Sequence, residues 1–366
     1  MTLHIVKRED TLSAIARMHG ANAASLAAAN QLGDGSRLPV GQALVAHPGG
    51  RPGRHILVHG CVPAGIGDSA LYGALPYLTY LTPYAYRLRP DGELSEIGDS
   101  ALVRIAYAND TAPLMAVTCR QEGSGQAEAV HALLGNAAIR NALLCNLRSA
   151  LLEGSYMGLV VDFSGLDQAD GPAYGDFLQQ LRERLAPEGY LLAAALCAGD
   201  SHAYAAAGNA CDLIILLSGG PECAYAPPRP VSPIGEVEEM LQSACVSLPA
   251  ARILLGMPGW GYNWTLPFSP SRPAQPVALA DVPDLAFGNY ANILYDADAQ
   301  APYFQYYDSN GAEHMVWFHD PRSIQARLRL VETFGLAGIS CWDLSRLYRP
   351  GFVSLAGMFQ VQKAFD

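Results

Sequence analysis

Residues 158–164 read Gly158-Leu159-Val160-Val161-Asp162-Phe163-Ser164, and this stretch decides the fold class. A short apolar run that ends in a carboxylate is typical of a strand buried on both faces, with a polar side chain at its carboxyl end. Similar runs recur at residues 56–58, 78–81, 114–117, 191–196, 213–217, 253–257 and 338–342, and most are followed by helical spacing, as in 173–185 and 324–334. Eight such strands in roughly 310 residues predict an α/β fold, a (β/α)8 TIM barrel whose functional site lies at the carboxyl ends of its strands.

The chain divides before this barrel. Residues 48–54, rich in Gly and Pro, carry no apolar periodicity and indicate a linker. Before the linker, strand patterns at 3–6 and 38–45 enclose two helical segments, and we expect Asp10 to cap the first helix. The sequence therefore predicts a small βααβ module at residues 1–47, a linker at 48–54 and the barrel at 55–366.

Composition excludes several classes of partner. The formal net charge is -11, and the two lysines are far apart at Lys7 and Lys363, so we expect no basic patch for nucleic acid or lipid headgroups. No apolar run approaches the ~18 residues of a membrane span, and the first residues lack the apolar stretch of a secretory signal peptide. The eight cysteines show no metal-ligand spacing. We therefore expect cytoplasmic synthesis, no metal, no cofactor, no nucleic acid, no membrane, and a neutral or polar ligand.

The N-terminal segment resembles a LysM module across residues 2–47. The resemblance is carried by Asp10-Thr11-Leu12-Ser13-Ala14-Ile15-Ala16, by the spacing to Asn30, and by the ending Pro39-Val40-Gly41-Gln42-Ala43-Leu44. It implies binding of N-acetylglucosamine polymers in a groove between residues 7–12 and 30–38, with Asp10, Thr11, Leu12, Asn30 and Leu32 as contacts. Glu9 stands where the family usually has glycine, which would narrow the groove. Alternatively, Asp10 and Asn30 only cap helices.

Three stretches of the larger segment resemble glycoside hydrolase family 18, and the resemblance covers about residues 55–366. They lie at 80–86 with 90–92, at 256–267, and at 316–323. Residues 299–311, with the turn Asp308-Ser309-Asn310-Gly311, predict the small α+β insertion before the eighth strand. Together with the LysM module, these motifs resemble the spore cortex-lytic and spore germination branch of the family.

The resemblance also implies where catalysis would take place. In the family, a strand with the motif D-x-x-D-x-D-x-E supplies a glutamic acid that protonates the glycosidic oxygen and an aspartate that orients the substrate's own acetamide nucleophile. Here the orienting aspartate is present as Asp162, but Ser164 replaces the acid. A serine hydroxyl cannot donate that proton near neutral pH, and the loss costs about 10²–10⁴ in rate. The strand at 213–217 also lacks the tyrosine and carboxylate that the family places at its end.

Aromatic residues near strand ends predict a sugar-binding cleft that persists without the acid, because aromatic faces stack on sugar rings. The candidates are Tyr84, Trp260, Tyr262, Trp264 and Trp342. Alternatives remain open. Trp342 could fill the barrel mouth, Trp260 and Trp264 could pack the insertion, and Asp162 could be a hydrogen-bonded core residue.

Three functions are compatible with these patterns, and we favour the first. It is a peptidoglycan-binding or N-acetylglucosamine-polymer-binding protein of the cell wall or spore envelope, in which a family 18 barrel has lost hydrolysis. The second is an active spore cortex-lytic N-acetylglucosaminidase, retaining and substrate-assisted, that uses Asp167 or Asp170 as a substitute acid. The third is a structural spore-coat component. The resemblance implies deposition on the spore envelope or cell wall without a signal peptide, whereas in an organism that does not sporulate we expect a cytoplasmic protein.

Overall fold

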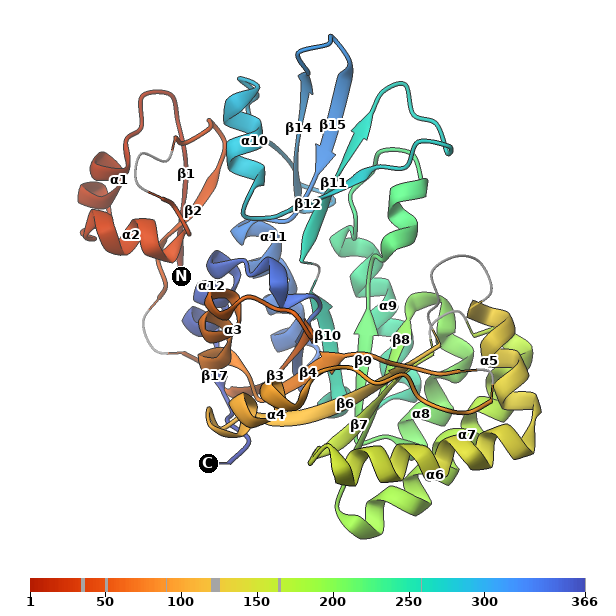
Figure 1. Ribbon diagram of the computed structural model, residues 1–366. Helices are drawn as coiled ribbons and strands as arrows, with labels where there is room; N and C mark the ends of the chain where they lie inside the picture. The colour runs from red at the N-terminus through yellow and green to blue at the C-terminus, as the bar shows by residue number, and fades with distance from the viewer. Residues whose placement is uncertain are drawn as a thin grey trace.

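The larger domain is a closed barrel of parallel strands, seen at the centre of Figure 1. The computed structural model describes residues 1–33, 37–49, 52–89, 91–119, 126–163, 166–257 and 259–365. Around the barrel the order is β3 (His55–Pro63), β4 (Tyr80–Tyr84), β6 (Ala112–Thr118), β7 (Gly158–Asp162), β8 (Leu191–Cys197), β9 (Leu213–Leu217), β10 (Ile253–Met257) and β16 (Gly338–Cys341). The barrel closes where β16 pairs in parallel with β3. The predicted (β/α)8 fold is confirmed.

Helices cover the outside of this barrel, as the sequence periodicity predicts. In α7 (Gly171–Leu185), Tyr174, Phe177, Leu178 and Leu181 are buried on one face. The remaining helices of this layer are α3 (Asp68–Ala74), α4 (Ser100–Tyr107), α5 (Gln126–Gly135), α6 (Ala137–Glu153), α8 (Tyr204–Ala210), α9 (Ile234–Ser247), α11 (Pro321–Thr333) and α12 (Arg349–Met358). Two short strands, β5 (Tyr86–Arg87) and β17 (Gln360–Val361), extend the sheet beside β6 and β3. None of the helices in the described ranges is long and apolar enough to cross a membrane.

Buried histidines inside the domain make its stability depend on pH. The ring of His59 lies in the barrel interior, with Nδ1 2.8 Å from Ser340 Oγ and Nε2 2.8 Å from Thr82 Oγ1. Burial lowers the pKa of His59 to about 3, and burial also lowers the pKa of His319 well below its ordinary value. Both side chains are therefore neutral in the folded protein at neutral pH.

We expect the free energy of unfolding to fall as the pH drops below about 6.5, because only the unfolded chain takes up protons on these histidines there. The slope contributed by each histidine is at most ~1.4 kcal/mol per pH unit. Urea unfolding between pH 7.5 and pH 5 measures it. A His59→Asn variant should reduce the slope, whereas substitution of the exposed His55 should leave it unchanged. A pH-independent free energy across this range would contradict the assignment.

The insertion predicted before the eighth strand is larger than residues 299–311. It forms a five-stranded antiparallel sheet between β10 and β16, in the order β12 (Gln275–Ala278), β11 (Trp260–Thr265), β15 (Glu313–Trp317), β14 (Ala301–Tyr307) and β13 (Leu294–Asp296), with helix α10 (Val282–Gly288). Residues 299–311 contain only one of these strands, β14.

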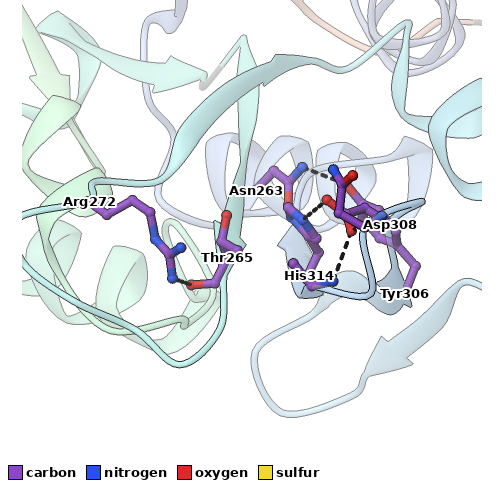
Figure 2. A network of polar contacts seen from close by, with 8 residues as sticks. Asn263, Thr265, Arg272, Tyr306, Asp308 and His314 are labelled. Atoms are coloured by element: carbon purple, nitrogen blue, oxygen red, sulfur yellow. Dashed lines mark hydrogen bonds and ion pairs between the residues drawn. The ribbon is translucent and has the colours of Figure 1, made fainter.

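A polar network ties the strands of this sheet together (Figure 2). Asn263 Nδ2 donates to the hydroxyl of Tyr306 at 2.8 Å, and Asn263 Oδ1 lies 3.0 Å from His314 Nδ1. The rings of Tyr306 and His314 stack at 4.7 Å between centroids. His314 Nε2 also lies 3.6 Å from Asp308 Oδ2, on the turn predicted from sequence. These contacts link β11, β14 and β15.

The N-terminal module has the predicted βααβ order. Strands β1 (Thr2–Ile5) and β2 (Ala43–His47) pair antiparallel, and α1 (Leu12–Met18) and α2 (Ala23–Ala29) pack on them. Ile15, Leu26 and Leu44 form its small core. The prediction that Asp10 caps the first helix is wrong by one residue. Thr11 is the N-cap, because its hydroxyl accepts the hydrogen bond from Ala14 N.

Candidate sugar-binding cleft

Two adjoining hollows at the carboxyl ends of the barrel strands form the candidate cleft. The first, of about 190 Å³, is bounded by residues at or just after the ends of β8, β9 and β10, among them Ser218 and Glu222. The second, of about 280 Å³, is bounded by residues that end β3 and β4, and by Asp343. Trp260 and Trp342 line both hollows, so the two hollows form one cleft with these tryptophans between them.

Asp162 lies beside Tyr84, which bounds the second hollow, but Asp162 itself bounds neither hollow. It is the last residue of β7 and is fully buried. The hydroxyl of Tyr84 donates a hydrogen bond to Asp162 Oδ2 at 2.5 Å. The ring of Tyr84 packs edge-on against Trp342, with centroids 5.0 Å apart. The structure therefore brings three of the predicted site residues together.

The Asp162 carboxylate also affects the thiols around it. Burial raises the pKa of Cys119 to about 12, and the charge of Asp162 adds to this effect. Burial likewise raises the pKa of Cys61, which lines the cleft, well above its ordinary value. These thiols are protonated at neutral pH, so they are neutral and do not act as nucleophiles. All eight cysteines are free thiols.

The three aromatic residues of β11 were all predicted as sugar contacts, but they lie at different places relative to the cleft. Trp260 is half-buried and lines the cleft. Its Nε1 donates to the Tyr262 hydroxyl at 3.0 Å, and that hydroxyl lies 3.2 Å from Gly220 O at the end of β9. Tyr262 thus supports the cleft wall from behind.

The prediction for Trp264 needs correction. Its side chain is only 1% exposed, and its Nε1 donates to Ala226 O at 2.8 Å. Trp264 therefore packs inside the insertion, which is the alternative left open above, and presents no face to a sugar. The reason is the strand period of two, which puts Trp260, Tyr262 and Trp264 on one face of β11, while only the first lies next to the barrel mouth.

The carboxylates that line the cleft are not those predicted as substitute acids. Ser164 lies outside the described residues. Asp167 is exposed and does not line the cleft. Asp170 is buried and lies 2.7 Å from His131 Nδ1.

Glu222 and Asp343 are instead the carboxylates at the cleft, and sequence reasoning missed both. Glu222 accepts a hydrogen bond from Gly220 N at 2.9 Å, and Asp343 accepts one from Ser345 N at 3.2 Å. Each follows a barrel strand closely in sequence, which is the signal that could have indicated them.

In the LysM module, Asn30 has a structural role. It is buried, and its Nδ2 donates to Leu26 O and Val45 O while its Oδ1 accepts from Val45 N at 2.7 Å. Leu12 and Leu32 are partly buried against the module core. Asn30 therefore joins α2 to β2 and has few hydrogen-bonding positions left for a sugar.

Asp10 and Thr11 remain on the first loop. Asp10 Oδ2 accepts from Lys7 N at 2.8 Å and lies 2.9 Å from His4 Nε2. The hydrogen bond with His4, followed by that from Lys7, lowers the pKa of Asp10, so its carboxylate is charged at neutral pH.

We expect Asn30→Ala to lower the free energy of unfolding by about 1–3 kcal/mol, because the buried amide of Val45 would lose its acceptor. Urea unfolding with hydrogen exchange at Val45 measures the loss. Asn22→Ala, which removes only an exposed helix cap, should cost about 1 kcal/mol. Equal stability of the native chain and the Asn30 variant would contradict the structural role.

The barrel, its aromatic cleft and the appended module together define a class of protein, a glycosidase-like barrel joined to a LysM module. The chain belongs to glycosyl hydrolases family 18, whose profile matches residues 122–346, and the LysM domain matches residues 4–46. This confirms both resemblances seen in the sequence.

Among its relatives is a cortical fragment-lytic enzyme of Bacillus anthracis, 32% identical over 301 residues, covering 79% of this chain and 70% of the relative. A putative sporulation-specific glycosylase, YdhD, of Bacillus subtilis (strain 168) is 29% identical, covering 79% of this chain and 71% of the relative. The crystal structure of the Bacillus cereus spore cortex-lytic enzyme SleL superposes with a TM-score of 0.81 at 30% identity, covering 100% of this chain and 88% of that one. The protein is thus a family 18 glycosidase-like protein related to spore cortex-lytic enzymes, and its two domains indicate ligands that contain N-acetylglucosamine.

Proposed function

We propose that this protein binds N-acetylglucosamine-containing glycan, such as peptidoglycan, in the barrel cleft and has lost the hydrolysis typical of its family. One observation carries the proposal. Asp162 accepts a hydrogen bond from Tyr84, and Trp342 beside Tyr84 lines the cleft, which supports sugar binding, while the sequence has Ser164 where the family has its acid.

Binding does not require the missing acid. An acetamide N–H can donate to a carboxylate at the Asp162 position, and the indole of Trp342 can stack on the apolar face of a sugar ring. Glu222 and Asp343 add acceptors for sugar hydroxyl groups at the cleft wall. These contacts can hold a glycan in its ground state without cleaving it.

Hydrolysis by the family route does require a proton donor. The glycosidic oxygen leaves as an alcohol only if a proton reaches it in the transition state, and a serine hydroxyl is far too weak an acid to supply one. No tyrosine is present among the residues directly after β9, which are Ser218, Gly219 and Gly220. The attacking acetamide would therefore lack the tyrosine hydroxyl that holds it in the family.

A second candidate function is hydrolysis with Glu222 as a substitute acid, since its carboxylate lines the same cleft. Measuring cleavage of a glycan by the purified protein distinguishes this function from the proposed one. Under the proposal, purified protein binds a tetramer of N-acetylglucosamine in calorimetry but releases no reducing ends from it or from cortex peptidoglycan.

Three variants decide between the two functions. Asp162→Asn should weaken binding under the proposal, because the acetamide loses a charged acceptor. Reducing-end release that Glu222→Gln abolishes would favour the second function. Glu238→Gln, at an exposed position on α9, is the matched control and should change neither readout.

We further propose that the protein acts at the spore envelope or cell wall, supported by its relatives' association with spore cortex and sporulation. Fractionation of spores or walls from the source organism, with an antibody against the chain, tests this location. A structural coat role without glycan binding would instead predict no saturable binding of the tetramer.

A further inference from the structure

Arg327 on α11 is a buried cation without a carboxylate partner among the described residues. Its side chain is only 1% exposed. Nη1 donates to Ser323 O at 3.5 Å and Nη2 donates to Ser232 O, while Nε has no hydrogen-bond partner in the part of the chain that the structure describes. Burial lowers the pKa of Arg327 to about 10, so the guanidinium is still charged at neutral pH. A buried charge is costly unless an opposite charge lies close to it, and two carbonyl groups do not supply one.

The buried carboxylate at the start of α11 is already paired with another arginine. Asp320 is the N-cap of the helix, and its Oδ1 accepts from Arg322 N at 2.8 Å. Its Oδ2 accepts from the Arg322 guanidinium, from Nε at 2.9 Å and from Nη2 at 2.6 Å. Glu332, near the other end of α11, is exposed to solvent. The charge of Arg327 is therefore not balanced by the acids of its own helix.

Three more buried side chains near Arg327 have polar atoms without partners. They belong to His319, Ser232 and Ser323, which are 1%, 3% and 0% exposed. Both ring nitrogens of His319 and both serine hydroxyl groups lack a hydrogen-bond partner among the described residues. Burial, followed by the charge of Arg327, lowers the pKa of His319 well below its ordinary value, so its ring is neutral and has one N–H. Hydroxyl and N–H donors thus gather around a cation.

These groups favour a small anion over a water molecule. An anion can accept hydrogen bonds from the hydroxyl and N–H groups and also neutralise the guanidinium, whereas water carries no charge. Because none of the four side chains is more than 3% exposed, a glycan cannot reach them. The occupant therefore has to be an ion of one or a few atoms.

The cluster borders the wall of the barrel cleft. Ser232 lies on the segment between β9 and α9, which also bounds the first hollow. A Cβ on Gly219, which lines that hollow, would lie 3.3 Å from Ser232 Cβ. His319 follows β15 of the insertion, and Ser323 and Arg327 lie on α11. An ion bound here would join the cleft wall to the insertion and to α11.

We propose that Arg327, His319, Ser232 and Ser323 form a buried halide site, which binds a chloride ion. The ion accepts hydrogen bonds from Arg327 Nε, from the two serine hydroxyl groups and from the N–H of His319. The site stabilises the folded chain, and it depends neither on glycan binding nor on hydrolysis.

Thermal unfolding of the full chain tests the proposal. We expect the melting temperature to be at least about 2 °C higher in sodium chloride than in sodium gluconate at equal ionic strength, because a ligand that binds only the folded state stabilises it. Gluconate is the comparison because it is too large for a closed site. Crystals grown in sodium bromide should show an anomalous bromide peak within hydrogen-bonding distance of the Arg327 guanidinium.

Two variants connect the effect to these residues. Arg327→Met removes the charge but keeps a long side chain, and it should abolish the difference between chloride and gluconate. Arg329→Met is the matched control, since Arg329 is exposed on the same helix, and it should keep the difference. If Arg327→Met does not fold, Ser323→Ala serves instead, because it removes only an unpaired hydroxyl group. Its apparent affinity for chloride, from melting temperature against chloride concentration, should fall at least about 10-fold.

Three results would overturn the proposal. A water molecule at this position in the bromide crystals would show that the site holds no ion. A bromide peak without any difference in melting temperature would mean binding at crystal concentration only. A chloride effect that persists in Arg327→Met, or in Ser323→Ala, as in Arg329→Met would place the ion elsewhere. None of these results bears on glycan binding in the cleft, which calorimetry with the tetramer tests separately.

Discussion

A Ser164→Glu variant is expected to release reducing ends from the N-acetylglucosamine tetramer at least about 100-fold faster than the native chain. The substitution returns a carboxylic acid to the position two residues after Asp162, where the family motif has its proton donor. The orienting aspartate and the aromatic cleft are already present. We expect a gain in the lower part of the usual 10²–10⁴ range, because the residues directly after β9, Ser218 to Gly220, include no tyrosine to hold the acetamide.

Ser164→Gln is the matched control, since glutamine has the size of glutamate but no acidic proton. It should release no more reducing ends than the native chain. If the Ser164→Glu variant releases reducing ends no faster than Ser164→Gln, the cleft has lost more than its acid. This result would contradict the view that the groups that bind the glycan are still in place.

The second large effect is expected on binding. Trp342→Ala should weaken the affinity of the barrel cleft for the tetramer at least about 10-fold, or ~1.4 kcal/mol, as truncation of a central aromatic contact does. Trp342 lines both hollows of the cleft and packs against Tyr84, which donates to Asp162. Its loss removes a stacking surface and loosens the residue that positions the carboxylate.

Tyr72→Ala controls for this change, because Tyr72 is an aromatic residue on the outer helix α3 and is 53% exposed. Calorimetry of the two variants and the native chain gives the comparison. A Trp342 variant whose cleft binds as tightly as the native protein would mean that Trp342 only fills the barrel mouth.

Strand periodicity predicted the part of the site that depends on local sequence. Gly158 to Asp162 forms a barrel strand with a carboxylate at its end because a buried parallel strand needs an apolar run, which is visible in the sequence. The same reasoning placed Trp342 at the end of the eighth strand, which in the structure ends one residue earlier, at Cys341. It could not show that Tyr84 and Asp162 form a hydrogen bond, because they lie 78 residues apart and the bond depends on barrel closure.

The features that the sequence did not predict depend on contacts between distant segments of the chain. Trp264 is covered by Ala226, from a loop whose path has no signal in the sequence. Asn30 was predicted to contact sugar, but its hydrogen bonds to Val45 depend on how α2 packs on β2. Gly41 was part of a family motif, and its close contact with Ile293 appears only when both domains are in place.

Turnover by the native protein tests the central claim most directly. Purified protein, shown by calorimetry to bind the N-acetylglucosamine tetramer, would be incubated with the tetramer and with cortex peptidoglycan, and reducing ends would be followed over time. We predict saturable binding with no release of reducing ends above the buffer control. Steady release by the native chain, abolished by Asp162→Asn or Glu222→Gln, would contradict the claim and identify a working glycosidase.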